Sequence, residues 1–344
     1  MKKHDCKSCK KKKHCDCKKE CSPCQTNDCA PLCPCEKPCN ETGRCCIRRQ
    51  NYFVNACPEN RHSHHKNPAK NKDPVRLYVQ DYGDINDPVI LCPDGTLSPE
   101  HFQYQITPLV EAGFRVVIVT PRGFGKSDKP YGPYNMDVWA DDLHSVIKQL
   151  DLNVNTLVGS TPQSRISLRY ITRHGCDRVE RLYFHSPNAL AAPHFALDPV
   201  IAAMEANRED TLNGLTLNVF SPIVPSTARL TWALQREFDI PLRVWVAILE
   251  SFFEDMTPEL KCVCAPLLGI VGDQDFFTPV PVAQAFVDGV PKGKLIVVPG
   301  QGHAVQIVDA PSYNDPLIAF AKSCDPCTFV KNFIPPVPPE PVPG

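Results

Sequence analysis

The stretch LVGSTPQSRISLRYITRHG, residues 157–175, decides the fold. An apolar run ends at Val158, a glycine and a proline then mark a tight turn, and a helical pattern follows as far as Gly175. A strand that turns directly into a helix is typical of parallel sheets, and one large class of enzymes holds its nucleophile at such a turn. The turn reads GSTPQ at residues 159–163, however, and not Gly-x-Ser-x-Gly.

The sequence on either side alternates strand and helix patterns. The continuous apolar run RVVIVT at 115–120 is typical of a strand buried in a parallel sheet. The segment MDVWADDLHSVIKQL at 136–150 places its apolar residues on one helical face. Residues 188–255 break the alternation and predict a helical cap over the edge of the sheet. We therefore expect an α/β fold over residues 74–323, with a mostly parallel sheet flanked by helices.

Several of these segments resemble, in their order and spacing, the α/β-hydrolase family, especially its small bacterial esterases and cofactor-free haloperoxidases. They include GFRVVIVTPRGFGKSDKP, RYITRHG, VGDQDFFTP and GQGHAV. The resemblance implies a catalytic triad in the chain order nucleophile, acid, histidine. It implies Thr161 at the nucleophile position, Asp275 as the acid and His303 as the base.

The resemblance also implies an altered site. The β-branch of Thr161 restricts its side chain, and Pro162 has no backbone N–H where the family has an oxyanion donor. Moving the attack to Ser160 restores an N–H in the next residue. In the second oxyanion loop, beside Gly95, Asp94 brings a negative charge. Because one lost donor costs about 10²–10³ in rate, we expect an inactive or nearly inactive hydrolase fold.

Residues 1–73 have a different composition and form a Cys/Lys-rich arm with a polar linker. Thirteen of the nineteen cysteines fall in residues 1–57, and residues 1–50 carry a net charge of +7 in a chain whose net charge is -1. Such a segment needs cross-links or metal to become ordered. Disulfides between chains fit its cysteines, and so does binding of zinc or copper(I). The expected cross-linking residues are Cys6, Cys9, Cys15, Cys17, Cys21, Cys24, Cys29, Cys33, Cys35, Cys39, Cys45 and Cys46.

Residues 324–344 form a tail in which Cys324-x-x-Cys327 precedes the proline-rich stretch PPVPPEPVPG at 335–344. The cysteine pair fits a disulfide, a metal half-site or a link between chains, and the prolines predict an extended spacer or docking peptide. The net charge gives no reason to expect a nucleic-acid partner. We see no apolar run of membrane-spanning length and no secretory signal.

Three functional hypotheses follow. The main one is a structural or assembly protein of a coat, fibre or particle shell, which self-associates through its cysteine-rich arm on an extracellular surface. Its composition resembles the cysteine-rich ends of proteins in disulfide-hardened coats, such as those of bacterial spores. The first alternative is a slow or unconventional esterase or acyl hydrolase that acts on carboxylic esters. The second is a binding module with a metal-binding tether. No cofactor is expected in the body of the protein.

Overall fold

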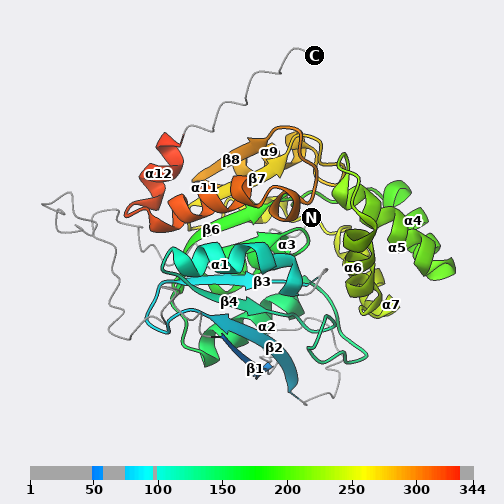
Figure 1. The fold of residues 1–344 in the computed structure, drawn as a ribbon, viewed down its shortest axis with the longest axis horizontal. Helices are drawn as coiled ribbons and strands as arrows, with labels where there is room; N and C mark the ends of the chain where they lie inside the picture. The colour runs from blue at the N-terminus through cyan, green and yellow to red at the C-terminus, as the bar shows by residue number, and fades with distance from the viewer. Residues whose placement is uncertain (1–48, 57–73, 96–98, 334–344) are drawn as a thin grey trace, which may run out of the picture.

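The computed structural model describes residues 49–56, 74–95 and 99–333. Within them an eight-stranded sheet has the order β1-β2-β4-β3-β5-β6-β7-β8 (Figure 1). The pairs β1–β2 and β2–β4 are antiparallel and all the others are parallel. The expected α/β fold with a mostly parallel sheet is therefore confirmed. The strands are β1 (Arg49–Ala56), β2 (Val75–Tyr82), β3 (Val89–Pro93), β4 (Arg115–Val119), β5 (Val154–Ser160), β6 (Val179–His185), β7 (Leu267–Gly272) and β8 (Gly293–Val298).

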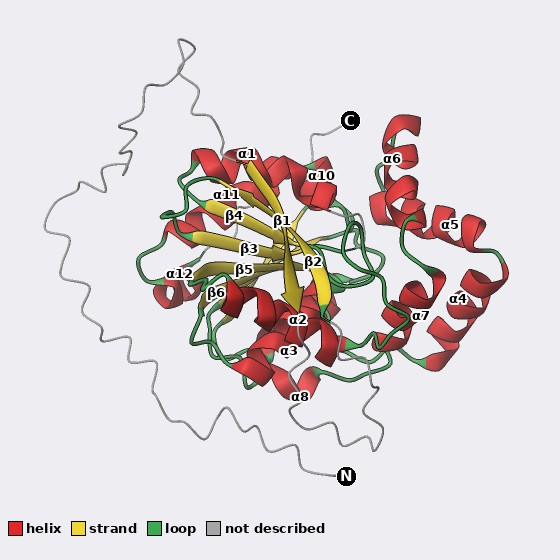
Figure 2. Ribbon diagram, turned by 90° about the horizontal axis from the view of Figure 1, so that it is seen from below, coloured by secondary structure: helices red, strands yellow, loops and turns green. Residues whose placement is uncertain are grey.

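Helices cover both faces of the sheet (Figure 2). Apolar residues of α1 and α11 pack on one face, against strand residues such as Ile90 and Ile118. Those of α2, α3 and α9 pack on the other face, against residues such as Leu91 and Leu157. The alternation of side chains along each buried strand supplies both faces at once. These helices are α1 (Gln103–Glu111), α2 (Met136–Gln149), α3 (Gln163–His174), α9 (Val280–Asp288) and α11 (Ala310–Lys322).

The segment expected to form a cap consists of four helices that stand to one side of the sheet (Figure 1). Its position agrees with the break in the strand and helix alternation at 188–255. Shorter helices connect the remaining elements. No helix among the described residues is both long and apolar enough to cross a bilayer. The cap helices are α4 (His194–Ala206), α5 (Arg208–Phe220), α6 (Thr227–Phe238) and α7 (Leu242–Ser251), and the short helices are η2 (Pro99–Phe102), α8 (Thr257–Leu260), α10 (Val305–Val308) and α12 (Pro326–Asn332).

The ordered body extends beyond the boundaries expected from the sequence at both ends. Strand β1 lies within residues 1–73, yet it pairs with β2 along all of its eight residues. Helix α12 lies within residues 324–344, where its residue Val330 is buried among apolar side chains of the sheet and of α11. The sheet therefore begins at Arg49, and the last helix follows residue 323 instead of ending there.

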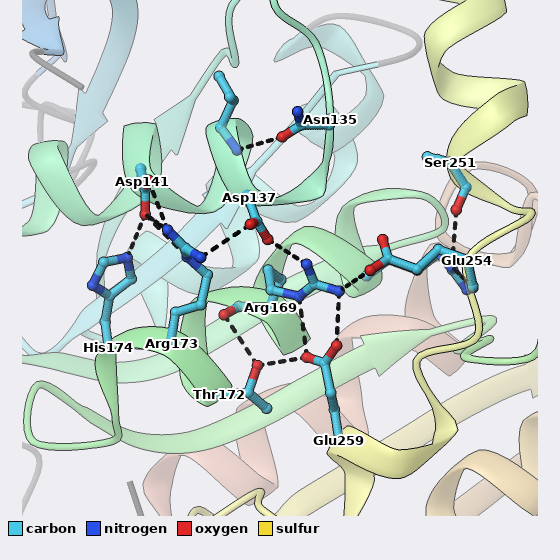
Figure 3. Close-up of polar contacts among 12 residues, drawn as sticks. Asn135, Asp137, Asp141, Arg169, Thr172, Arg173, His174, Ser251, Glu254 and Glu259 are labelled. Carbon is cyan, nitrogen blue, oxygen red and sulfur yellow. Dashed lines mark hydrogen bonds and ion pairs between the residues drawn. The ribbon is translucent and has the colours of Figure 1, made fainter. Parts of the chain in front are cut away.

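The second half of helix α3 is held by a network of ion pairs that we call the Arg169 network (Figure 3). Arg169 contacts Asp137 of α2 and bonds Glu254 at 2.6 Å and Glu259 at 2.7 Å. On the same helix, Arg173 also contacts Asp137, at 3.1 Å. The remaining members are Asp141, which pairs with Arg173 and His174, and Thr172, which donates a hydrogen bond to Glu259. The network fixes α3 against α2 and against the segment that follows the cap.

A disulfide provides a covalent link in the same region. Cys176, which follows α3, is bonded to Cys264, which precedes β7, across a sequence separation of 88 residues. Sequence spacing alone did not predict this pair. Cys324 and Cys327 are not bonded to each other in the structure. The Cys327 thiol instead contacts the Lys292 amine at 3.3 Å.

Candidate active site

The carboxyl ends of β5 and β6 lie side by side, and they bring a hydroxyl and an imidazole together. Ser160 is the last residue of β5 and is directly opposite His185, the last residue of β6. The two side chains meet with 3.1 Å between Ser160 Oγ and His185 Nδ1. Binding sites in open parallel sheets form at this edge. Sequence analysis missed His185, although the strand pattern VERLYFH ends on it and could have placed it there.

The turn from β5 into α3 holds the residue expected to be the nucleophile. The turn is tight because Gly159 packs on the helix: a Cβ at this position would lie 2.8 Å from the Ser164 Cα. The Thr161 hydroxyl donates a hydrogen bond to the backbone carbonyl of Ser186. Thr161 is not among the described non-glycine residues with positive φ, which are Asp151 and Ser186. The strained backbone typical of a nucleophile elbow therefore does not occur at Thr161.

The expected acid and base are in direct contact. Asp275 follows β7, His303 follows β8, and their Oδ2 and Nδ1 atoms lie 2.8 Å apart. The second oxygen of Asp275 accepts hydrogen bonds of 2.9 Å from the backbone N–H groups of Phe277 and Thr278. Ser186 donates its hydroxyl to Asp275 Oδ2 at 2.6 Å. Ser186, another residue that sequence analysis missed, therefore connects the Thr161 turn to the acid.

The surroundings of Asp275 keep its carboxylate ionised. Burial on its own raises the pKa of this group. The neighbouring His303 and the hydrogen bonds from His303, Ser186 and Thr278 outweigh burial and lower the pKa to about 2. A carboxylate can only accept hydrogen bonds, so Nδ1 of His303 carries a proton and Nε2 is left with its lone pair. His303 is thus oriented as a base.

His185 has the opposite environment. It is fully buried, and burial lowers its pKa well below the usual histidine value. The neighbouring His303 and His101 lower it further, whereas Asp275 raises it. The His185 and His303 rings lie 5.6 Å apart between centroids. The site therefore contains two histidines, of which His185 is neutral at pH 7.

The expected oxyanion region is occupied by a side-chain amide. A Cβ on Gly95 would lie 2.4 Å from Gln163 Nε2, so a side chain at this position would displace the amide. Gln163 is buried, and neither of its amide atoms has a hydrogen-bond partner among the described residues. Asp94, whose charge we expected beside the oxyanion, instead pairs with His101 at 3.5 Å. Pro162 stands before α3, where it offers no N–H.

The other expected sites lie elsewhere. The twelve cysteines expected to cross-link, Cys6 to Cys46, and the proline-rich stretch from residue 335 fall outside the described residues. Binding of zinc or copper(I) by those cysteines therefore stays a prediction, as does self-association through the arm. In the part of the chain that the structure describes, no group of three His, Cys, Asp or Glu residues could hold a metal ion. A surface groove of about 600 Å³ lies between α9, β8 and α12, and its lining includes none of Ser160, His185, Asp275 and His303.

Comparison with known proteins points to the α/β hydrolases. A family model described as alpha/beta hydrolase fold matches residues 87–247. The AB hydrolase superfamily protein YisY of Bacillus subtilis is 28% identical over 270 residues, which cover 74% of this chain and 98% of that protein. The bifunctional esterase/perhydrolase DCH of Acinetobacter calcoaceticus is 26% identical over 73% of this chain and 98% of that protein. The crystal structure of bromoperoxidase from Bacillus anthracis matches with a TM-score of 0.71 and 25% identity, over 80% of this chain and 100% of that one.

These comparisons support an α/β-hydrolase of the branch of small bacterial esterases and non-heme haloperoxidases. This finding corrects the main functional hypothesis. The relatives that match this chain over nearly their whole length are named as hydrolases, esterases and haloperoxidases, so a structural coat or assembly role is contradicted. The expectation of an inactive fold is not supported either. That expectation treated the turn in isolation, without His185 or the buried amide of Gln163.

Proposed function

We propose that this chain hydrolyses small carboxylic esters by acyl transfer, with His303 as a general base and Asp275 as the carboxylate that orients it. The observation that carries the proposal is the 2.8 Å contact between His303 and the buried, ionised Asp275. A histidine oriented by a buried carboxylate is part of the arrangement that acyl-transfer enzymes use. The similarity to an esterase/perhydrolase supports carboxylic esters as the substrate class.

The chemistry follows from the atoms that the site presents. A hydroxyl of the 160–161 turn attacks the ester carbonyl and forms an acyl-enzyme as the alcohol leaves. Water then attacks the acyl group, and Nε2 of His303 takes the proton of that water as general base. Asp275 remains ionised throughout and stabilises the imidazolium that forms. Release of the acid restores the hydroxyl.

The test is turnover of p-nitrophenyl acetate by the purified full-length chain, compared with that of a His303→Ala variant. A positioned general base contributes about 10²–10⁴-fold to the rate, and we expect a loss of that size. His194→Ala is the matched control, because His194 is an exposed residue of α4 that forms an ion pair with the exposed Asp198. Equal turnover by the unmodified protein and by His303→Ala would refute the proposed function.

A further inference from the structure

We propose that the attacking hydroxyl belongs to Ser160 and not to Thr161, and that His185 accepts its proton. This inference rests on the proposed ester hydrolysis and assigns its first step. It places the nucleophile one residue before the position that the family resemblance implies. It also gives a catalytic role to a histidine at the end of β6, outside the Asp275–His303 pair.

The hydrogen-bond partners distinguish the two hydroxyls. The partner of Thr161 Oγ1 is the backbone carbonyl of Ser186, which can only accept a hydrogen bond. The Thr161 proton is therefore donated to that carbonyl, and no hydrogen bond among the described residues joins the Thr161 hydroxyl to a base. The partner of Ser160 Oγ is an imidazole nitrogen, which accepts a proton when the ring is neutral. Of the two hydroxyls, only that of Ser160 is hydrogen-bonded to a base.

Strand register explains why this contact is built into the fold. Ser160 and His185 are partners at the end of the parallel β5–β6 ladder, so their side chains leave the sheet together. Ser160 is half-buried whereas His185 is fully buried, so the imidazole is shielded from solvent. Burial keeps His185 neutral at pH 7, and in the tautomer that carries its proton on Nε2 the Nδ1 atom accepts the hydrogen bond from Ser160.

Attack by Ser160 instead of Thr161 also restores a backbone donor to the oxyanion. In this family the backbone N–H of the residue after the nucleophile stabilises the developing oxyanion. After Thr161 comes Pro162, which has no N–H, whereas after Ser160 comes Thr161, which has one. The loss of one such donor costs about 10²–10³ in rate, so the difference favours Ser160. The Gln163 amide beside Gly95 is a further N–H donor in this region.

The proposed first step transfers the acyl group from the ester to Ser160. Ser160 Oγ forms a bond to the ester carbonyl carbon, and its proton moves to Nδ1 of His185. The bond from that carbon to the alcohol oxygen breaks, and the leaving alkoxide takes the proton from His185. Water then cleaves the acyl-serine: its hydroxyl goes to the acyl group, and its proton returns to Ser160 by way of His303. The two histidines thus serve different steps.

Covalent labelling with an alkyl fluorophosphonate identifies the nucleophile in the unmodified protein. The hydroxyl oxygen displaces fluoride from phosphorus, and the adduct is located by peptide mass spectrometry. We expect the adduct on Ser160, and we expect it to be lost in Ser160→Ala and retained in Thr161→Val. An adduct on Thr161 would overturn the inference, and so would turnover that continues undiminished in Ser160→Ala.

Variants of the two histidines test the division of steps. In His185→Gln we expect labelling to slow by about 10²–10⁴-fold, since the base for the attack is gone. In His303→Gln we expect labelling to persist and p-nitrophenyl acetate to give a burst of p-nitrophenolate without steady turnover. Labelling of His185→Gln at the unmodified rate would refute the role of His185. Turnover that depends on His303 without an adduct on Ser160 would refute this inference alone, whereas absence of both turnover and adduct would refute the proposed function as well.

Discussion

The two ends of helix α3 differ in whether their polar side chains have hydrogen-bond or ion-pair partners. In its second half, the side chains of Arg169, Thr172 and Arg173 all bond to acidic partners in the Arg169 network. In its first turn, the Gln163 amide and the Ser164 hydroxyl are buried, and the structure shows no hydrogen-bond partner for them among the described residues. A buried polar group without a partner costs about 1–3 kcal/mol. The first turn is therefore poorly explained by stability, and it directly follows the β5–α3 turn that holds the proposed nucleophile, Ser160.

The largest expected effect on stability is at Arg169, in the second half of α3. We expect Arg169→Met to lower the free energy of unfolding by about 3 kcal/mol, because the change leaves several partly buried carboxylates without their shared cation. Urea denaturation measures the loss. The control is Arg178→Met, whose ion pair with Asp151 is exposed and should contribute less than about 1 kcal/mol. Equal effects of the two substitutions would mean that the network does not hold α3.

Acidification tests the charged part of the site. The pKa of Asp275 is about 2 in the folded protein, against about 3.9 for an unfolded aspartate. The folded value is the lower one, so Asp275 contributes stability above about pH 4, and that contribution is lost as the pH falls from about 4 to 2. We expect Asp275→Asn to remove this part of the pH dependence, on the order of 2 kcal/mol.

The measurement is urea denaturation of both proteins across this pH range. Asp315→Asn serves as the control, because Asp315 is an exposed aspartate of α11. Parallel curves for Asp275→Asn and the unmodified protein would show that the contact with His303 does not stabilise the folded state.

The smallest expected effect is a gain in stability, and it is expected at Gln163 in the first turn of α3. Gln163→Met replaces an amide without a partner by an apolar side chain of similar size, so we expect the free energy of unfolding to rise by about 1 kcal/mol. Gln149→Met is the control, because Gln149 donates a 2.6 Å hydrogen bond to the Asn55 carbonyl and should give no gain. A loss of stability in Gln163→Met would indicate that the amide has a partner in solution.

Much of the fold could be predicted from local sequence, because continuous apolar segments and amphipathic helical patterns indicate a buried parallel sheet. Strand β1 could not, since its RQNYFVNA sequence is half polar and mostly exposed at the sheet edge. It follows a cysteine-rich segment, and only pairing with β2 makes it a strand. The Cys176–Cys264 disulfide could not be predicted either, because its two cysteines lie 88 residues apart and only the tertiary structure brings them together.

The candidate site divides in the same way. Asp275 and His303 lie in loops with recognisable local sequences, so they could be named before their contact was known. The contact of Ser160 with His185 depends on the register between two strands, which local sequence does not specify. The fit of the Gln163 amide against Gly95 depends on how α3 meets the loop after β3, and this too appears only in the folded chain.

The Cys176–Cys264 disulfide closes a covalent ring, and the four cap helices lie entirely inside it. Ser160 precedes the ring, whereas Asp275 and His303 follow it. A protease that cut any cap loop would therefore leave a nicked but undivided molecule, with the serine and the acid–histidine pair still joined through sulfur. Only cleavage together with reduction would remove the covalent connection between the two halves.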